Sequence, residues 1–145
     1  MLAYILLAIV IGALGGIHVP INGALGEHIE SPLVATFVFY GIGFLLIALV
    51  SLVFADRTAF LALAQAPRWY LIAGVISVLV VGTSTFLIPR IGALTLFVVF
   101  VSAQLVVRMV LSHFGWLGSP VDPVNGVKLF GIALLLSGAF LVVSD

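Results

Sequence analysis

Five long apolar runs fill most of this chain, and each is about as long as a bilayer is thick. A helix rises about 1.5 Å per residue and the hydrocarbon core measures roughly 30 Å, so one span needs about 20 apolar residues. We place the spans at residues 2–22, 31–54, 68–88, 91–111 and 126–143. Because 64% of the 145 residues are hydrophobic and 7% are charged, a water-soluble fold is excluded. The sequence predicts an all-α membrane protein, one transmembrane domain over residues 1–145.

The few polar residues exclude several classes of function. The formal net charge is zero, so no basic surface for nucleic acid is expected. The chain has no cysteine, and its three histidines are too dispersed for a metal site. It also lacks a glycine-rich phosphate loop and a serine, histidine and carboxylate set that could converge. We therefore expect no enzyme activity, no cofactor and no bound metal. The first run lacks the basic segment of a signal peptide and is expected to be retained.

The first span gathers unusual residues for a membrane helix between residues 12 and 26. On a helix, His18 and Asn22 share one face. Pro20 removes a backbone donor, so we expect the helix to kink or open beside it. Two glycines that permit close helix packing flank this face, Gly12 and Gly16. A kinked helix with inward polar groups is typical of the lining of a transport pathway.

Other spans carry further candidate ligands. Tyr40 lies on a stripe of small residues in the second span, and Gln104 and Arg108 lie one turn apart on the fourth. We predict substrate binding by His18, Asn22, Tyr40, Gln104 and Arg108, and helix kinking and packing by Gly12, Gly16 and Pro20. Structural alternatives stay open for each ligand. A histidine or glutamine can instead bond to a neighbouring helix, an asparagine can cap backbone groups freed by a proline, and a tyrosine can pack or anchor at the interface. An arginine can snorkel or pair with a partner's acid.

The connections between the spans are short. Ser31 and Pro32 are predicted to be the N-cap and first residue of the second span. Residues 55–67 and 112–125 are expected to be loops. A break at Pro89 and Arg90 would leave a very short connection and so an antiparallel hairpin of the third and fourth spans.

The charges are unevenly divided between the two membrane faces. On the N-terminal side lie Asp56, Asp122 and four of the five basic residues: Arg57, Arg68, Arg108 and Lys128. The far side holds Arg90, Glu27, Glu30 and Asp145. The positive-inside rule therefore favours a cytoplasmic N-terminus. In an antiparallel pair of copies, the acidic end of one would lie at the depth of the basic end of the other.

Several motifs in succession resemble one known family. They are Pro20–Gly26, Ser31-Pro32, Gly41-x-Gly43, Pro67–Trp69, Pro89–Ala93, Gln104, His113–Gly115 with Gly118, and Gly131 with Gly138. In this order they resemble the small five-helix YdcZ-type proteins of the drug/metabolite transporter superfamily. Three positions depart from the family pattern: His18 replaces a usual glutamine, Ser112 replaces an aspartate, and Arg108 replaces a small residue. The membrane glutamate of the small multidrug exporters is also absent, so their proton exchange is not implied.

The resemblance implies a half-transporter in the inner (plasma) membrane. Such a subunit crosses the lipid five times and pairs with an inverted copy, as an antiparallel homodimer or with an oppositely oriented sister protein. A small polar or organic solute would bind between the two inverted subunits near the midplane. Two other functions are also compatible with the residues: a dimeric ion channel or pore, and a non-transporting membrane scaffold or accessory subunit.

Overall fold

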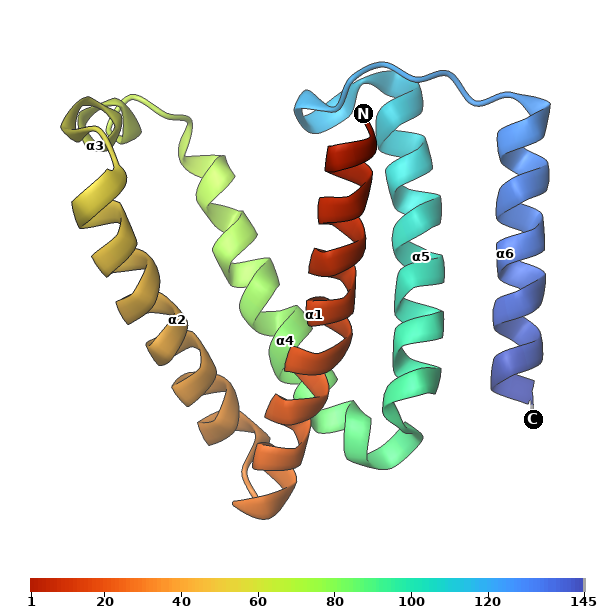
Figure 1. The fold of residues 1–145 in the computed structure, drawn as a ribbon, viewed down its shortest axis with the longest axis horizontal. Coiled ribbons are helices and arrows are strands. Elements are labelled where there is room, and N and C mark those ends of the chain that lie inside the picture. The colour runs from red at the N-terminus through yellow and green to blue at the C-terminus, as the bar shows by residue number, and fades with distance from the viewer. Residues whose placement is uncertain (145) are drawn as a thin grey trace. The chain divides into compact units, whose positions relative to one another are not determined.

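The computed structural model describes residues 1–144 as helices with short connections (Figure 1). The elements are α1 (Leu2–His28), α2 (Pro32–Phe54), α3 (Arg57–Leu63), η1 (Arg68–Leu71), α4 (Ile72–Ile91), α5 (Ala93–Phe114), η2 (Trp116–Gly118) and α6 (Gly126–Ser144). In this part of the chain, five helical segments are long and apolar enough to cross a membrane, η1 and α4 counting as one. The expected all-α fold with five candidate spans is confirmed. Asp145, expected on the far side, lies outside the described residues.

The chain forms two compact units, one of residues Met1–Arg90 and one that begins at Ile91. In the first unit, α1, α2 and α4 approach one another near the turn that joins α1 to α2 and diverge toward α3 (Figure 1). Ser31 caps α2 by accepting a hydrogen bond from the Val34 N–H at 3.3 Å, and Pro32 follows as the first helical residue. The predicted start of the second span is confirmed.

The first helix differs from the expected one in length and continuity. It runs through Pro20 without opening and continues past the expected end at Asn22 as far as His28. Inside a bilayer an opened turn would leave several backbone groups without partners, at several kcal/mol each. Proline removes one such bond, so a continuous helix costs less than an opened one. Of the kink or opening expected at Pro20, the continuous helix excludes the opening, and the kink stays a prediction.

Two further local expectations were wrong. Residues 55–67 contain the helix α3, which begins because the Asp56 carboxylate accepts a hydrogen bond from the Thr58 N–H at 3.0 Å. The chain also does not break at Pro89 and Arg90, because α4 includes both. The break falls at Gly92, whose φ of 80° is accessible to glycine and strained in other residues.

In the second unit, the segment between α5 and α6 is bonded to the end of α5. The His113 ring accepts a hydrogen bond from the Val124 N–H at 3.0 Å. The Asp122 N–H donates to the Ser112 carbonyl at 2.9 Å. Asn125 then caps α6 by accepting from the Lys128 N–H at 2.9 Å. These bonds fix the loop over the end of α5.

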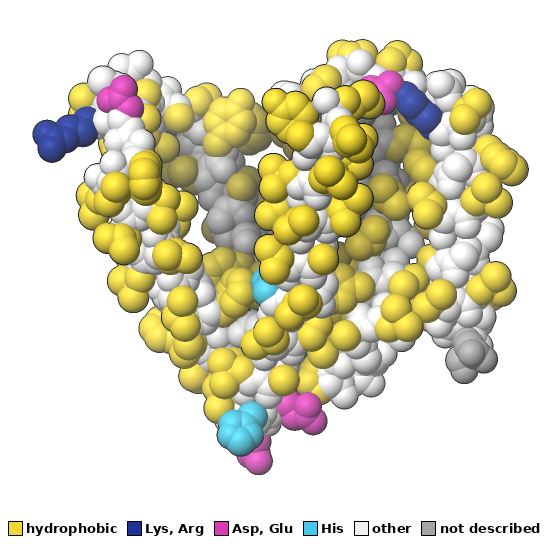
Figure 2. Space-filling view, viewed as in Figure 1, with side chains coloured by type: hydrophobic (Ala, Val, Ile, Leu, Met, Phe, Trp, Pro, Cys, Tyr) yellow, Lys and Arg dark blue, Asp and Glu magenta, His cyan; other side chains and the backbone are white. Residues whose placement is uncertain are grey.

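The interior of this protein is small and polar. Among the described residues the buried apolar side chains are Val19 and Ala35, and the buried polar ones are Asn22, Thr36, Ser84 and Thr85. Large apolar side chains lie outside, along the length of the helices, and most charged ones lie at the helix ends (Figure 2). This arrangement suits helices whose outer faces contact lipid or another protein.

Candidate functional site

A buried hydrogen bond joins α1 to α4 in the first unit. The Asn22 amide donates to the Thr85 hydroxyl at 2.6 Å, and the two residues are 4% and 0% exposed. Thr85 donates in turn to the Val81 carbonyl of its own helix at 2.9 Å. Asn22, a predicted substrate ligand, thus stabilises a contact between two helices, whereas its predicted structural alternative was to cap backbone groups freed near Pro20.

Two glycines of α1 make this contact possible. A Cβ on Gly26 would lie 2.9 Å from the Thr85 methyl group and 3.2 Å from the Pro32 Cα. A Cβ on Gly23 would lie 3.0 Å from Ile88 Cγ2. Sequence reasoning noted these glycines as parts of a motif and missed their role in packing. Their partners on α4, Thr85 and Ile88, are more than 50 residues away in the chain, so no local signal identifies them.

Tyr40 joins α2 to α4 farther from the turn. Its hydroxyl shares a hydrogen bond of 2.6 Å with the Ser77 hydroxyl. One turn of α2 away, Thr36 lies 3.8 Å from the position of a Cβ on Gly82. The face of α2 that carries Thr36 and Tyr40 therefore packs against α4.

His18 lies on the exposed side of α1 and shares a cavity with Asn22. The cavity measures about 250 Å³ and is lined by His18, Ile21, Asn22, Leu25, Val38, Phe39 and Ile42. His18 Nδ1 lies 3.3 Å from the Leu14 carbonyl, and its ring stacks on Phe39 with centroids 5.7 Å apart. The first unit therefore brings together two predicted ligands in one cavity, while Tyr40 lies outside its lining.

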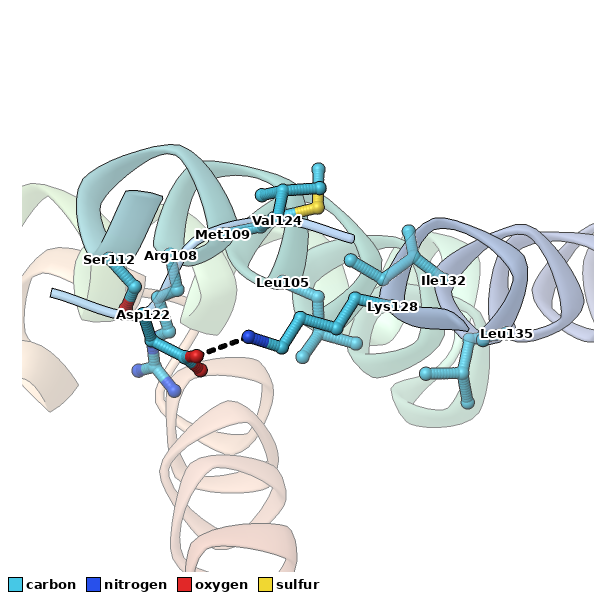
Figure 3. Close-up of a pocket in the computed structure, with 10 residues that line it drawn as sticks. Leu105, Arg108, Met109, Ser112, Asp122, Val124, Lys128, Ile132 and Leu135 are labelled. Carbon is cyan, nitrogen blue, oxygen red and sulfur yellow. Dashed lines mark hydrogen bonds and ion pairs between the residues drawn. The ribbon is translucent and has the colours of Figure 1, made fainter. Parts of the chain in front are cut away.

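The two ligands predicted on the fourth span belong to the second unit. Gln104 is half-buried on α5 and lies outside the lining of the pocket beside it. Arg108 is exposed and lines a pocket of about 400 Å³ together with Asp122 and Lys128, which form an ion pair (Figure 3). Arg108 makes no side-chain hydrogen bond with residues 1–144.

The two glycines predicted to permit close helix packing, Gly12 and Gly16, have no neighbouring helix among the described residues. A Cβ on Gly12 or Gly16 would meet no atom of residues 1–144 within 4 Å. The predicted packing of these glycines therefore involves no contact within this chain, and contact with another molecule stays a prediction.

A polar cavity lies at the turn between α1 and α2. It measures about 320 Å³ and is lined by Gly26, Glu27, Glu30, Pro32, Pro89 and Arg90. Arg90 donates a hydrogen bond to the Phe86 carbonyl and lies 3.5 Å from the centroid of the Phe86 ring. Glu27 and Glu30 thus lie beside one basic residue at this end of the first unit.

One comparison with known proteins identifies the family. A family model described as "Putative inner membrane exporter, YdcZ", of the drug/metabolite transporters, matches residues 3–141. The chain belongs to this YdcZ family. The family is one of exporters rather than enzymes, and its members lie in the inner membrane. No curated protein and no solved structure gives a significant match.

The YdcZ match covers residues of both units. It begins in the first turn of α1 and ends within α6, so it includes all five long helices.

Proposed function

We propose that this YdcZ-family chain is one half of a secondary transporter, and that two antiparallel copies together export a small polar or organic solute. The observation that carries the proposal is the exposed position of His18 in the middle of a membrane helix. A polar ring facing lipid at this depth is costly, so it needs another protein surface or a hydrated pathway beside it. An inverted second copy supplies both.

The rest of the same α1 face supports a second copy. Tyr4 and Ile11 on this face are 79% and 59% exposed. Gly12, Gly15 and Gly16 beside them leave open space where a Cβ would be. Small residues let another backbone approach closely, which is the main source of helix association in lipid.

The charges of the first unit support inversion of that copy. Glu27 lies in the last turn of α1 and Glu30 just after it, whereas Arg57 and Arg68 lie in the connection between the far end of α2 and α4. Antiparallel copies would bring the acidic end of one close in depth to the basic end of the other. Parallel copies would bring like charges together.

We assign the pathway to His18, Asn22, Tyr40 and Gln104. These side chains offer donors and acceptors and include no carboxylate, ammonium or guanidinium group, which suits a polar solute better than a strongly charged one. Arg108 lies within two turns of the end of α5, so its surroundings favour the interfacial role over direct substrate binding.

The orientation of the termini tests the paired arrangement. Reporters active on only one side of the membrane are fused to each end of the chain in whole cells. We expect each terminus to give signal from both compartments. Signal from one side alone would exclude the antiparallel homodimer and direct the search to a sister protein or a parallel assembly.

Crosslinking tests the same arrangement independently, because the chain has no native cysteine. Leu2→Cys and Leu25→Cys lie near opposite ends of α1. An antiparallel pair predicts a Leu2–Leu25 crosslink between copies that carry one cysteine each. A parallel pair predicts Leu2–Leu2 crosslinks.

Transport itself is tested by reconstitution of the purified chain in liposomes. Exchange of a loaded mixture of small polar solutes, reduced by His18→Ala and Gln104→Ala, is the expected outcome. Single-channel conductance would show a pore instead. A scaffold would give a different result. Neither the unaltered chain nor the two variants would transport solute, and cells that carry the variants would keep the normal phenotype.

A further inference from the structure

Two neighbouring cavities of the second unit form one groove between α5 and α6. The first, of about 400 Å³, has a lining that includes Arg108, Asp122 and Lys128. The second, of about 530 Å³, has an almost wholly apolar lining that includes Phe97, Val101 and Val142. Leu105 and Leu135 line both, so the cavities are continuous. The groove therefore has one charged end and one long apolar part.

The charged end is positive overall. It holds two basic side chains, Arg108 and Lys128, and one acid, Asp122. Lys128 pairs with Asp122 and also donates to the Pro123 carbonyl at 2.9 Å, so its charge is largely satisfied. Arg108 makes no side-chain hydrogen bond to residues 1–144 and keeps its guanidinium available for an anion. Figure 3 shows Arg108 beside the paired residues in this pocket.

The depth of the groove matches one lipid leaflet. Arg108 lies six residues before the end of α5, which is about 9 Å along the helix. Lys128 is the third residue of α6. From Lys128 to Val142 the groove follows α6 for roughly 21 Å. The charged end thus lies near the membrane interface, and the apolar part extends along the hydrocarbon region.

Two glycines of α6 keep the groove open. Gly131 lines the charged part and Gly138 lines the apolar part, seven residues apart on one face. A Cβ on either would meet no described atom within 4 Å, so these glycines do not bring two helices together. They leave the space that a larger side chain would fill.

We propose that this groove binds one anionic phospholipid, with its phosphate on Arg108 and one acyl chain along the apolar part. Basic pockets between membrane helices near the interface suit acidic headgroups, and the adjoining apolar channel suits the chain of the same molecule. A soluble anion would leave the apolar part empty. This inference is independent of the transport proposal and makes Arg108 a lipid ligand.

Native mass spectrometry of the purified full-length chain tests the proposal. The protein in detergent is titrated with phosphatidylglycerol and, separately, with phosphatidylcholine that has the same acyl chains. We expect one phosphatidylglycerol per chain, retained about fivefold more strongly than phosphatidylcholine. In Arg108→Gln this preference disappears, while weak retention of both lipids persists.

Filling the apolar part of the groove tests the acyl-chain site separately from the headgroup site. Gly138→Leu should abolish retention of both lipids. The matched control is Gly74→Leu on α4, which also has open space around its Cβ and lies outside the groove. Gly138→Ala serves as the milder variant if leucine impairs folding, and circular dichroism checks the helix content of each.

Three results would overturn the proposal. Arg108→Gln could keep the full preference for phosphatidylglycerol, which would place the headgroup elsewhere. Inorganic phosphate could displace phosphatidylglycerol at comparable concentration, which would identify a free-anion site. Finally, Gly138→Leu could retain lipid while changing the proportion of dimer, which would identify a second copy as the occupant.

Discussion

Asn22 and Thr85, 63 residues apart in sequence, meet in a buried hydrogen bond of 2.6 Å that joins α1 to α4. In lipid the hydrophobic effect does not hold helices together, so close packing and hydrogen bonds of this kind carry the contact. The bond also orients the Asn22 side chain beside the cavity that it shares with His18.

Replacing Thr85 with valine should weaken the first unit. Valine keeps the shape of threonine but removes the acceptor of the Asn22 amide, and such bonds in membrane proteins contribute about 0.6 kcal/mol. Reversible unfolding of the chain in mixed micelles measures the loss. A double-mutant cycle with Asn22→Leu isolates the pair, and additive effects of the two changes would show that they do not interact.

Alanine at Gly26 should be far more harmful than alanine at Gly12. The added methyl group would lie 2.9 Å from the Thr85 methyl and 3.2 Å from the Pro32 backbone, whereas at Gly12 it meets open space. Overpacking of this kind typically costs about 1 to 3 kcal/mol. Thermal unfolding in detergent measures both variants. Equal stability of the two would contradict the close approach of α1 to α4.

Glycine at position 30 should stabilise the turn after α1. Glu30 has a φ of 54°, and its N–H bonds to the Glu27 carbonyl while the Ser31 N–H bonds to the Gly26 carbonyl. This helix ending favours glycine, because a Cβ in the left-handed conformation costs about 1 kcal/mol. Glu30→Gly should therefore raise the melting temperature. Glu30→Val, the matched control, should lower it.

The stability of α3 should depend on pH through Asp56. Hydrogen bonds from the backbone and side chain of Thr58 lower the pKa of this carboxyl below its ordinary value of 3.8. The ionised form is favoured in the folded state, so its contribution is complete above pH 3.8 and is lost as the pH falls through the lowered pKa. Hydrogen exchange of the α3 amides should therefore lose protection in this acidic range. Asp56→Asn caps without titrating, and an identical pH trend in that variant would refute the role of the carboxylate.

The sequence was sufficient to predict the five long apolar helices, because their length and composition determine them. An apolar run as long as a bilayer is thick has one stable backbone in lipid, and Ser31 with Pro32 is a strong local start signal. Local sequence patterns gave wrong predictions where the free energy of the backbone in lipid, or a short segment length, decided the structure. At Pro20 an opening was one of two predicted outcomes, and the bilayer favours a continuous helix instead. The helix α3 is seven residues long, which is too short for a periodic pattern to identify.

The candidate site was less accessible to sequence reasoning. His18 and Asn22 could be paired because they are one turn apart on one helix, and they do share a cavity. The acceptor of the Asn22 amide could not be identified, because nothing in the sequence near Thr85 selects it over other hydroxyl groups. The groove beside Arg108 depends on a loop folded back over α5, which periodicity does not describe.

The small interior of the first unit also constrains how this sequence can drift in evolution. Positions on the outer faces, such as Leu2 or Phe44, need only stay apolar, so many replacements there are nearly neutral. At Gly23 and Gly26 a single added carbon would crowd Ile88 and Thr85. Relatives of this chain should therefore diverge fastest in their largest residues and slowest in their smallest.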